Sequence, residues 1–301
     1  NAGGHSWRAG INQFSDLSDE EFKNSYLMRP QKCSATNTVG VPGETTNLRG
    51  ASENKKKAAD LPPSLDWRSR GIVSEVKNQG GCGSCWAFST TGSTEGAYFA
   101  ATGKLVSLSE EDLVQCDQVD AGCQGGLMDN GFKFIETNGV AAETAYPYMS
   151  GTGIRGMCSK DKETAKVVTV TGFTDVPAED ETTLLSAVAQ QPVSVAIEAD
   201  KSTFQLYKGG VLDNKGCGTK LDHGVLVVGY GSASDANGTP YWKVKNSWGA
   251  SWGEAGYIRM VRNKNQCGIA TEPSYPTGAT KDSGGGGGGG SYSYGNGVEQ
   301  A

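Results

Sequence analysis

The side chains of this sequence best suited to nucleophilic catalysis are one histidine and one cysteine. Histidine exchanges protons near neutral pH, and the chain has two, His5 and His223. Because His5 lies in a short N-terminal region, imidazole-based catalysis in the main part of the chain would have to use His223. A lone histidine is more often structural than catalytic, and two histidines exclude a zinc site built from several imidazoles.

Cys85 differs from the other cysteines in its position. It precedes Trp86-Ala-Phe-Ser and falls in the first turn of an expected helix, where the helix dipole and free backbone N–H groups favour a thiolate. Three interpretations stay open at this point: a nucleophile, a structural disulfide partner, or half of a Cys82-x-x-Cys85 redox pair. The redox pair would follow a strand of a parallel βαβ unit, whereas residues 77–81 are typical of a turn.

Asn246 and Gln79 are candidates to complete such a site. The Asn246 carbonyl could accept a hydrogen bond from one imidazole nitrogen and orient His223, while Trp248 could shield that bond from water. Gln79 precedes Cys85 by six positions, and its side-chain N–H groups, with the Cys85 backbone N–H, could form an oxyanion hole. Taken alone, Asn246 is more often an ordinary residue between a strand and a turn.

Two regions of different pattern would position these residues. No proline occurs over 84–101 and Gly103 follows, which predicts a helix that begins near Cys85 and stops at that glycine. Later segments are rich in β-branched and aromatic residues and are bounded by turn residues, which predicts strands over 193–197, 225–228, 241–245 and 257–261. We therefore expect an α+β fold with a helical lobe, an antiparallel sheet or barrel, and the site at their junction.

Composition limits the function further. The chain has 301 residues, 36% of them hydrophobic and 20% charged, enough for a substantial core. A net charge of −6 argues against nucleic acid as a partner. The sequence has no run of about 18 apolar residues, so it predicts no membrane span. Eight cysteines, spaced unlike zinc or iron–sulfur ligands, favour an oxidising compartment. Because the chain opens at Asn1 without a signal segment, we expect its natural start to be missing.

The two ends have their own character. Residues 15–22 predict a short acidic helix, in which Ser18 and Glu21 have the spacing of a capping box and Leu17 with Phe22 that of a hydrophobic staple. Residues 31–60 have the composition of an exposed linker. The glycine run 284–290 predicts a flexible tail over 279–301.

Three separated segments, taken together, resemble the catalytic segments of papain-family cysteine proteases. They are Gln79-Gly-Gly-Cys-Gly-Ser-Cys-Trp-Ala-Phe-Ser89, Leu221-Asp-His-Gly224 and Asn246-Ser-Trp-Gly-Ala-Ser-Trp-Gly-Glu254. The resemblance implies a two-lobed papain-like fold, with a helical left domain, an antiparallel β-barrel-like right domain and the active site in the cleft between them. It implies that Cys85 is the nucleophile, His223 the base and acid, Asn246 the orienting residue and Gln79 the oxyanion donor, supported by Trp248.

The resemblance also sorts the cysteines, whose connectivity the sequence alone leaves open. It implies the disulfides Cys82–Cys123, Cys116–Cys158 and Cys217–Cys267, which leaves Cys85 free. Cys33 remains unpaired in the leader, without an assigned function. No metal or organic cofactor is expected.

A further segment, Gly10-Ile-Asn-Gln-Phe-Ser-Asp16, resembles the Gly-x-Asn-x-Phe-x-Asp motif of the inhibitory propeptide of cathepsin L-like members. We therefore expect residues 1–60 to be a partial inhibitory propeptide and linker, 61–278 the peptidase domain and 279–301 the tail. The resemblance implies that the propeptide leaves at acid pH, as four of its carboxylates lose charge-dependent contacts: Asp16, Asp19, Glu20 and Glu21.

Substrate preference follows from the same resemblance. The S2 pocket, which receives the side chain two residues before the scissile bond (P2), would be lined by Leu127, Met128, Ala196, Leu221 and Gly224. Such a lining predicts large apolar P2 side chains. Glu272 would lie at the pocket floor, so we expect Arg to be accepted there as well; the alternative is that Glu272 faces solvent.

The expected function is therefore that of an endopeptidase made as a zymogen. Its expected partners are protein and peptide substrates, its own propeptide and cystatin-type inhibitors, and it is expected to be a monomer in the lysosome or vacuole, or secreted. Two other classes of function fit the sequence less well. A catalytically silent protein on this fold would lack the nucleophile or the base, and a protein acting chiefly as an inhibitor through residues 1–27 would not need the complete catalytic set.

Overall fold

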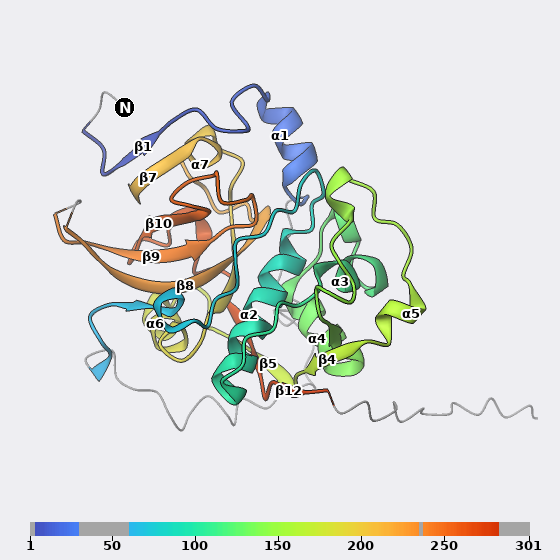
Figure 1. Cartoon of the computed structure of the whole chain (residues 1–301). Coiled ribbons are helices and arrows are strands. Elements are labelled where there is room, and N and C mark those ends of the chain that lie inside the picture. Colours follow the sequence, from blue (N-terminus) through green and yellow to red (C-terminus); the bar gives the residue numbers. More distant parts are fainter. Residues whose placement is uncertain (1–3, 30–59, 235–236, 283–301) are drawn as a thin grey trace, which may run out of the picture.

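The computed structural model describes residues 4–29, 60–234 and 237–282, which form two lobes on either side of one helix, α2 (Cys85–Thr102). In Figure 1 the other helices of the helical lobe lie on one side of α2, and the large sheet of the β lobe lies on the other. The remaining helices are α1 (Asp19–Tyr26), α3 (Glu110–Cys116), α4 (Met128–Asn138), α5 (Lys160–Glu163), α6 (Glu181–Val188) and α7 (Ser202–Gln205). None of the helices in these ranges is long and apolar enough to cross a membrane.

The strands form two sheets. They are β1 (Trp7–Ala9), β2 (Leu65–Asp66), β3 (Val140–Ala141), β4 (Lys166–Thr169), β5 (Gly172–Asp175), β6 (Val193–Ile197), β7 (Tyr207–Leu212), β8 (His223–Ala233), β9 (Thr239–Lys245), β10 (Tyr257–Val261), β11 (Ser274–Thr277) and β12 (Thr280–Lys281). The large sheet has the order β1-β7-β10-β9-β8-β6-β11-β5, with β2 paired to β8, and the small one has the order β12-β4-β3.

Each lobe has its own hydrophobic core. The helical lobe packs α2, α3 and α4 around a cluster that includes Trp86, Leu113, Phe132 and Ile135. The β lobe is filled by the inner side chains of the large sheet, among them Val195, Val227, Trp242 and Ile258. Two cores on one chain produce the two-lobed α+β fold that the sequence predicted. The large sheet is antiparallel as predicted except for its β7–β10 pair, which is parallel.

The central helix is buried on most of its circumference because both lobes use it. Two glycines permit the close approach of the β lobe: a Cβ at Gly92 would lie 2.8 Å from Leu226 Cδ2, and one at Gly96 would lie 2.6 Å from Pro192 Cδ. The helix ends where Gly103 adopts a left-handed conformation, with φ at 72°, as the sequence predicted. This packing fixes the position of the first turn of α2.

The predicted strands are present. β6 and β10 cover the predicted ranges 193–197 and 257–261, whereas β8 and β9 extend beyond the predicted 225–228 and 241–245. The extension follows from backbone pairing, because the register between β8 and β9 continues to Ala233 and Thr239, past the apolar run that marked each strand.

The N-terminal segment (residues 4–29) is docked on the β lobe, where β1 pairs antiparallel with β7. At α1 the capping box predicted for Ser18 and Glu21 is formed, with the serine hydroxyl accepting from Glu21 N and the glutamate accepting from Ser18 N at 2.9 Å. Phe14 and Phe22 are fully buried, and their rings contact Trp248 edge-on at 5.1 and 5.3 Å between centroids. The segment thus uses the core of the β lobe as its own.

The predicted start of the tail at residue 279 is wrong. Ala279 is buried in the core of the helical lobe, and Thr280 and Lys281 pair with Thr169 and Val168 of β4. A two-residue edge strand is held by backbone pairing and carries no hydrophobic pattern, so it could not be predicted from the sequence. The rest of the predicted tail, the linker over 31–59 and Cys33 lie outside the described residues.

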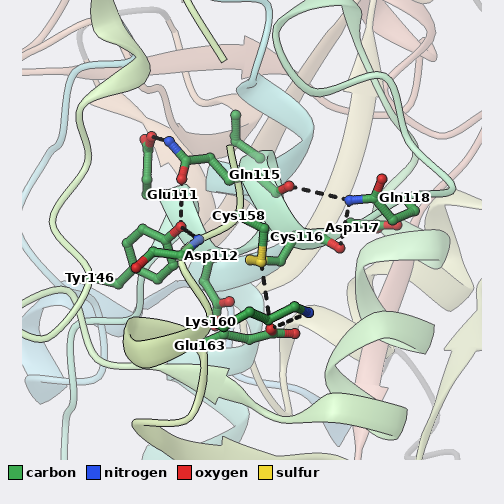
Figure 2. The surroundings of a disulfide bond; sticks show 12 residues. Glu111, Asp112, Gln115, Cys116, Asp117, Gln118, Tyr146, Cys158, Lys160 and Glu163 are labelled. Carbon is green, nitrogen blue, oxygen red and sulfur yellow. Dashed lines mark hydrogen bonds and ion pairs between the residues drawn. A yellow bond between two sulfur atoms is a disulfide. The ribbon is translucent and has the colours of Figure 1, made fainter. Parts of the chain in front are cut away.

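The three disulfides that the resemblance implied are present: Cys82–Cys123, Cys116–Cys158 and Cys217–Cys267. Figure 2 shows Cys116–Cys158, which joins the end of α3 to the segment before α5; the Glu163 carboxylate lies 3.5 Å from Cys158 Sγ. This trio is the group of described side chains with the spacing of metal ligands, but its two sulfurs are bonded to each other. Disulfides of this kind form in oxidising compartments.

Candidate active site

Cys85 begins α2, at the junction of the two lobes, and is the free cysteine of the described chain. The first residues of a helix have unpaired N–H groups, and the N–H groups of Cys85 and Trp86 favour the ionised sulfur. From the β lobe, Gly224 N donates to Cys85 Sγ at 3.3 Å. A Cβ at Gly224 would lie 3.1 Å from the Cys85 carbonyl, so this position allows the strand to approach the helix closely.

His223 opens β8 beside Gly224, and its Nε2 lies 2.8 Å from Asn246 Oδ1. An amide oxygen can only accept, so Nε2 must carry the proton of the neutral ring. Nδ1 is then the unprotonated nitrogen, and it has no hydrogen-bond partner among the described residues. This is the state that a general base requires, held by the asparagine that the sequence singled out.

Trp248 covers this pair. Its ring stacks on His223 with centroids 4.6 Å apart, and all of the imidazole is inaccessible to solvent. Burial lowers the pKa of His223 to about 4, although the bond to Asn246 acts in the opposite direction. Burial also raises the pKa of the Cys85 thiol to about 12. With the N-terminal segment in place, both groups are therefore neutral.

Gln79 is fixed at both ends of its side chain. Its Oε1 accepts from the Ser247 hydroxyl at 2.6 Å, and its Nε2 donates to the carbonyl oxygens of Cys82 at 2.9 Å and Tyr26 at 3.0 Å. The Tyr26 carbonyl belongs to the N-terminal segment. The amide expected to stabilise an oxyanion thus holds a carbonyl of the chain itself.

The residues predicted to line S2 lie close to this segment. Met128, Ala196 and Leu221 are buried in one apolar cluster, and Met28 is part of the same cluster. The Met28 backbone N–H donates to the carbonyl of Asp222 at 2.8 Å. Leu127 is half-buried at the start of α4, and Gly224 lies against Cys85 as described above. A methionine of the N-terminal segment therefore belongs to the same apolar cluster as three of the predicted pocket residues and is bonded to the residue that follows Leu221.

Glu272 is half-buried and belongs to an acidic group. Burial raises the pKa of Asp175 to about 7, and the charges of Asp129 and Glu272 add to this increase, while Lys133 opposes it. Asp129 directly follows Met128 in α4. The three carboxyl groups thus lie close enough to interact, and one of them is next in sequence to a predicted pocket residue.

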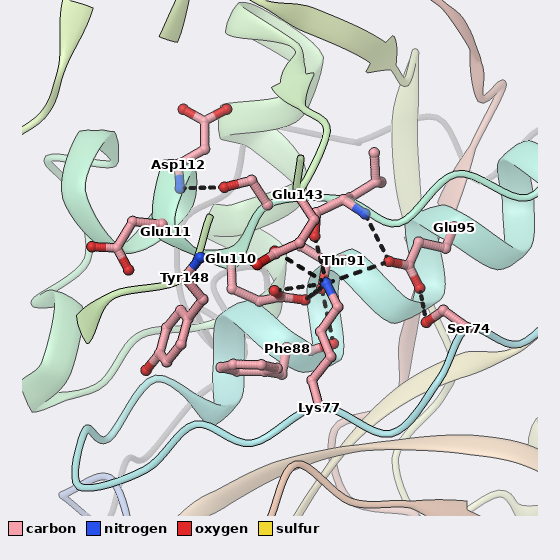
Figure 3. Close-up of polar contacts among 12 residues, drawn as sticks. Ser74, Lys77, Phe88, Thr91, Glu95, Glu110, Glu111, Asp112, Glu143 and Tyr148 are labelled. Carbon is pink, nitrogen blue, oxygen red and sulfur yellow. Dashed lines mark hydrogen bonds and ion pairs between the residues drawn. The ribbon is translucent and has the colours of Figure 1, made fainter. Parts of the chain in front are cut away.

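A buried polar network lies behind the site (Figure 3). Lys77 Nζ lies 2.8 Å from the Glu110 carboxylate, 3.3 Å from that of Glu143 and 3.9 Å from that of Glu95. Burial raises the pKa of Glu110 to about 7 despite the charge of Lys77. A cavity of about 20 Å³, large enough for one water molecule, is lined by residues of this network and by Asn246.

Known proteins match both the sequence and the fold. The model of the papain family of cysteine proteases matches residues 61–277. Cysteine proteinase RD21A of Arabidopsis thaliana is 48% identical over 278 residues, which cover 90% of this chain and 56% of that protein. The KDEL-tailed cysteine endopeptidase CEP2 of the same plant is 47% identical over 277 residues, 90% of this chain and 74% of that protein.

Among solved structures, the proform of Amb a 11, a ragweed pollen cysteine protease, superposes with a TM-score of 0.78 at 38% identity, covering 91% of this chain and 82% of that one. The chain belongs to the papain family of cysteine proteases. Its main domain is that of a papain-type cysteine endopeptidase. It spans little more than half the length of RD21A.

Several residues of the site were missed by sequence reasoning. Tyr26 and Met28 were not foreseen at the site, and the only sign of them was an apolar run after the acidic helix. Ser84 and Tyr148 bond to each other, and Tyr148 also donates to the Gln79 carbonyl, but a serine and a tyrosine so far apart in sequence carry no signal. Lys77 was noted only as part of a turn, since a single lysine does not reveal burial.

Proposed function

We propose that the protein is the zymogen of an endopeptidase in which Cys85 is the nucleophile and His223 the general base and acid. Asn246 orients the imidazole, and Gln79 with the Cys85 backbone N–H forms the oxyanion hole. The observation that carries this proposal is the carbonyl of Tyr26 bound to Gln79 Nε2 at 3.0 Å. We infer that this carbonyl takes the place that the carbonyl of a substrate would have at Gln79.

In the proposed reaction, the Cys85 thiolate attacks the substrate carbonyl while His223 is protonated. The negative oxygen of the tetrahedral intermediate is held by Gln79 and the Cys85 N–H. His223 gives its proton to the departing amine as the C–N bond breaks, which leaves a thioester on Cys85. The neutral imidazole then takes a proton from water, the hydroxyl attacks the thioester, and the acid product leaves while the thiol and imidazole are restored.

We further propose that the N-terminal segment is the inhibitor that keeps the zymogen inactive. It excludes water from Cys85 and His223, and it places Tyr26 and Met28 where a substrate would bind. Its acidic residues differ in what they contribute. Hydrogen bonds from Ser18 lower the pKa of Glu21, so the capping box is present above the usual pKa of a glutamate and is lost as the pH falls through the lowered value.

Loss of the capping box would loosen the start of α1, so we propose that acid release of this segment involves this turn. Asp16, Asp19 and Glu20 are exposed beside it. The ion pair between Lys23 and Asp200, 2.8 Å apart, lowers the pKa of Asp200 and so persists to lower pH than an unperturbed pair.

For substrate choice, we propose that P2 takes large apolar side chains and also Arg. The apolar part is supported by Met28, which shares one apolar cluster with Met128, Ala196 and Leu221. The preference for Arg would come from Glu272, together with the carboxyl groups of Asp129 and Asp175. Because the pKa of Asp175 is raised to about 7, the acidic group is least negative at acid pH. We therefore expect kcat/KM for P2-Arg substrates to increase relative to that for P2-Phe substrates as the pH rises through 7.

The processed enzyme should be tested on paired fluorogenic dipeptides with P2-Phe and P2-Arg, from pH 5 to 8 with reductant. Wild type should cleave both, and Cys85→Ser neither. An irreversible epoxide directed at thiols should titrate one site per wild-type molecule. The absence of any turnover by processed, folded wild type would sink the proposal.

The floor of the pocket is tested separately by Glu272→Ala and Glu272→Gln. Both should lower kcat/KM for P2-Arg while kcat/KM for P2-Phe stays within about twofold, since a desolvated charge pair contributes roughly 10-fold or more. Equal values for P2-Arg in wild type and both variants would mean that Glu272 faces solvent. The endopeptidase proposal would survive that result.

The proposed function also implies binding partners and a location in the cell. We propose a monomer that binds protein substrates, its own propeptide and cystatin-type inhibitors. The three disulfides support an oxidising compartment of the endomembrane system, the vacuole or lysosome, or secretion. A relative named for its KDEL tail supports passage through that system.

A further inference from the structure

Tyr148 joins two parts of the site that are far from it in sequence. It lies in the loop after β3, and its hydroxyl is 2.8 Å from the backbone carbonyl of Gln79 and 2.8 Å from the hydroxyl of Ser84. A carbonyl can only accept, so the tyrosine donates to Gln79 and must accept from Ser84. Burial raises the pKa of Tyr148, which keeps its proton in place as the donor.

Ser84 is the residue before Cys85 and the N-cap of α2, yet its side chain does not cap the helix. A serine at this position ordinarily accepts a hydrogen bond from an N–H of the first turn. Two other serines of this chain do so: Ser18 caps α1 and Ser109 caps α3. The hydroxyl of Ser84, which is fully buried, is directed to Tyr148 instead.

The diversion of this hydroxyl leaves first-turn amides to the nucleophile. Ala87 N already bonds to the Ser84 carbonyl at 2.8 Å, so Trp86 N–H is the amide that a free Ser84 hydroxyl would take. That N–H, with those of Cys85 and Gly224, lowers the pKa of the Cys85 thiol. A conventional cap would therefore compete with the sulfur for the same donor.

Tyr148 is itself held firmly. Its backbone N–H donates to Glu143 at 2.9 Å, and its ring meets the edge of Phe88 on α2 at 4.9 Å. Figure 3 shows Tyr148 beside Phe88, with Glu143 reaching Lys77 in the buried network. The network thus fixes the tyrosine on which the start of α2 depends.

We propose that Tyr148 is a positioning residue for the nucleophile: its hydroxyl holds Ser84 away from the first-turn amides of α2, which stay available to the Cys85 sulfur, and it fixes Gln79 beside them. This rests on the proposed role of Cys85. On the β lobe, the charge of Asp222 opposes ionisation of the thiol. His223 precedes Gly224, whose N–H donates to the sulfur. Neither Asp222 nor His223 is changed by the variants below.

The test uses the processed enzyme with Tyr148→Phe, Ser84→Ala and the double variant. The pKa of the thiol is measured from the rate of alkylation by iodoacetamide against pH, and kcat and KM from a P2-Phe dipeptide. Tyr148→Phe should raise the thiol pKa by about one unit, the loss of one hydrogen bond to a charged group, and should lower kcat more than KM changes.

The double variant distinguishes a positioning role of Tyr148 from a nonspecific loss of structure at the site. Without the Ser84 hydroxyl no competing cap can form, so the thiol pKa should return to the wild-type value, while kcat stays low because Gln79 has lost its anchor. Ser84→Ala alone should leave the thiol pKa where it is. A double variant with the raised pKa of Tyr148→Phe, or a Tyr148→Phe enzyme with the wild-type value, would overturn the proposal.

A third variant covers the case in which Tyr148→Phe does not fold. Ser84→Asn supplies a capping amide oxygen while Tyr148 is intact, and it should raise the thiol pKa in the same way; an unchanged value would count against the proposal. If Cys85 of wild type fails to react with iodoacetamide or the epoxide at any pH, the proposed function fails instead.

Discussion

At the scale of single residues, Asn246 determines which imidazole nitrogen carries a proton, because its Oδ1 accepts from His223 Nε2. In Asn246→Ala the ring loses this acceptor and can turn or change tautomer. We expect kcat/KM of the processed enzyme to fall roughly 10- to 100-fold, the effect of one hydrogen bond to a group that becomes charged. Steady-state kinetics on the P2-Phe dipeptide would measure it.

The melting temperature of Asn246→Ala serves as the control. Asn246 is buried, so some loss of stability is expected. If the variant is still folded at the assay temperature, a lower kcat/KM reflects a misoriented His223 ring and not unfolding. Wild-type kcat/KM in this variant would show that Trp248 alone is enough to hold the ring.

Cys85 should respond to pH differently before and after processing. In the zymogen, burial raises the pKa of its thiol to about 12, so the reactive thiolate is scarce at every ordinary pH. Once the N-terminal segment leaves, the thiol regains water and a protonatable His223, and its reaction with iodoacetamide should become rapid below pH 7. The rates should be compared in a Cys33→Ser background, so that Cys85 is the only thiol counted. Equal rates in both forms at pH 6 would contradict this.

At the scale of elements, docking of the N-terminal segment depends on aromatic packing more than on charge. Phe22 is fully buried against Trp248, and Phe22→Ala should weaken docking by about 3–5 kcal/mol. Lys23 is 45% exposed in its pair with Asp200, and Lys23→Ala should cost about 0–1 kcal/mol. Autoprocessing at pH 5 should therefore be much faster in Phe22→Ala and nearly unchanged in Lys23→Ala.

These adjacent positions on α1 make a matched pair. The two variants would be followed by the time course of conversion to the smaller product on a gel, each in the same buffer. Faster processing in Lys23→Ala than in Phe22→Ala would show that the ion pair is the main restraint.

Elements with a repeating hydrophobic pattern could be predicted from the sequence, and the others could not. β6 was predicted to the residue because β-branched Val193, Val195 and Ile197 alternate along it, between a proline and a polar turn. β12 was missed because two exposed residues held by backbone pairing have no pattern. At the site, Cys85, His223 and Asn246 were found by their types and by resemblance. Tyr148 was not, because its role depends on a contact across 64 positions of the chain.

At the scale of the whole molecule, Lys77 ties together buried carboxylates of the helical lobe. Glu110 is the one most affected: burial raises its pKa to about 7, so the stability it contributes is fully present below the pKa of an unfolded glutamate and is lost as the pH rises through 7. Removing Lys77 raises that pKa further. Lys77→Met should therefore destabilise the protein by about 3–5 kcal/mol near pH 8 and much less near pH 4.

Thermal unfolding of wild type and Lys77→Met at pH 4 and pH 8 would measure this difference. A Lys77→Met/Glu110→Gln double variant is the control, since it removes the charge that Lys77 neutralises and should recover part of the loss at pH 8. A loss of stability that does not change with pH would indicate packing by the lysine stem instead of its charge.

The pairing of β12 with β4 has a consequence for how the protein is made. Strand β12 lies near the end of the described chain, but it completes the small sheet of the helical lobe, whose other strands are 140–141 and 166–169. During synthesis, the other strands of this sheet leave the ribosome early, and more than a hundred further residues are added before β12 is made. Chains that stop short of residue 279 would then leave Ala279 out of the core, and quality control in the secretory pathway would encounter them as incomplete first lobes.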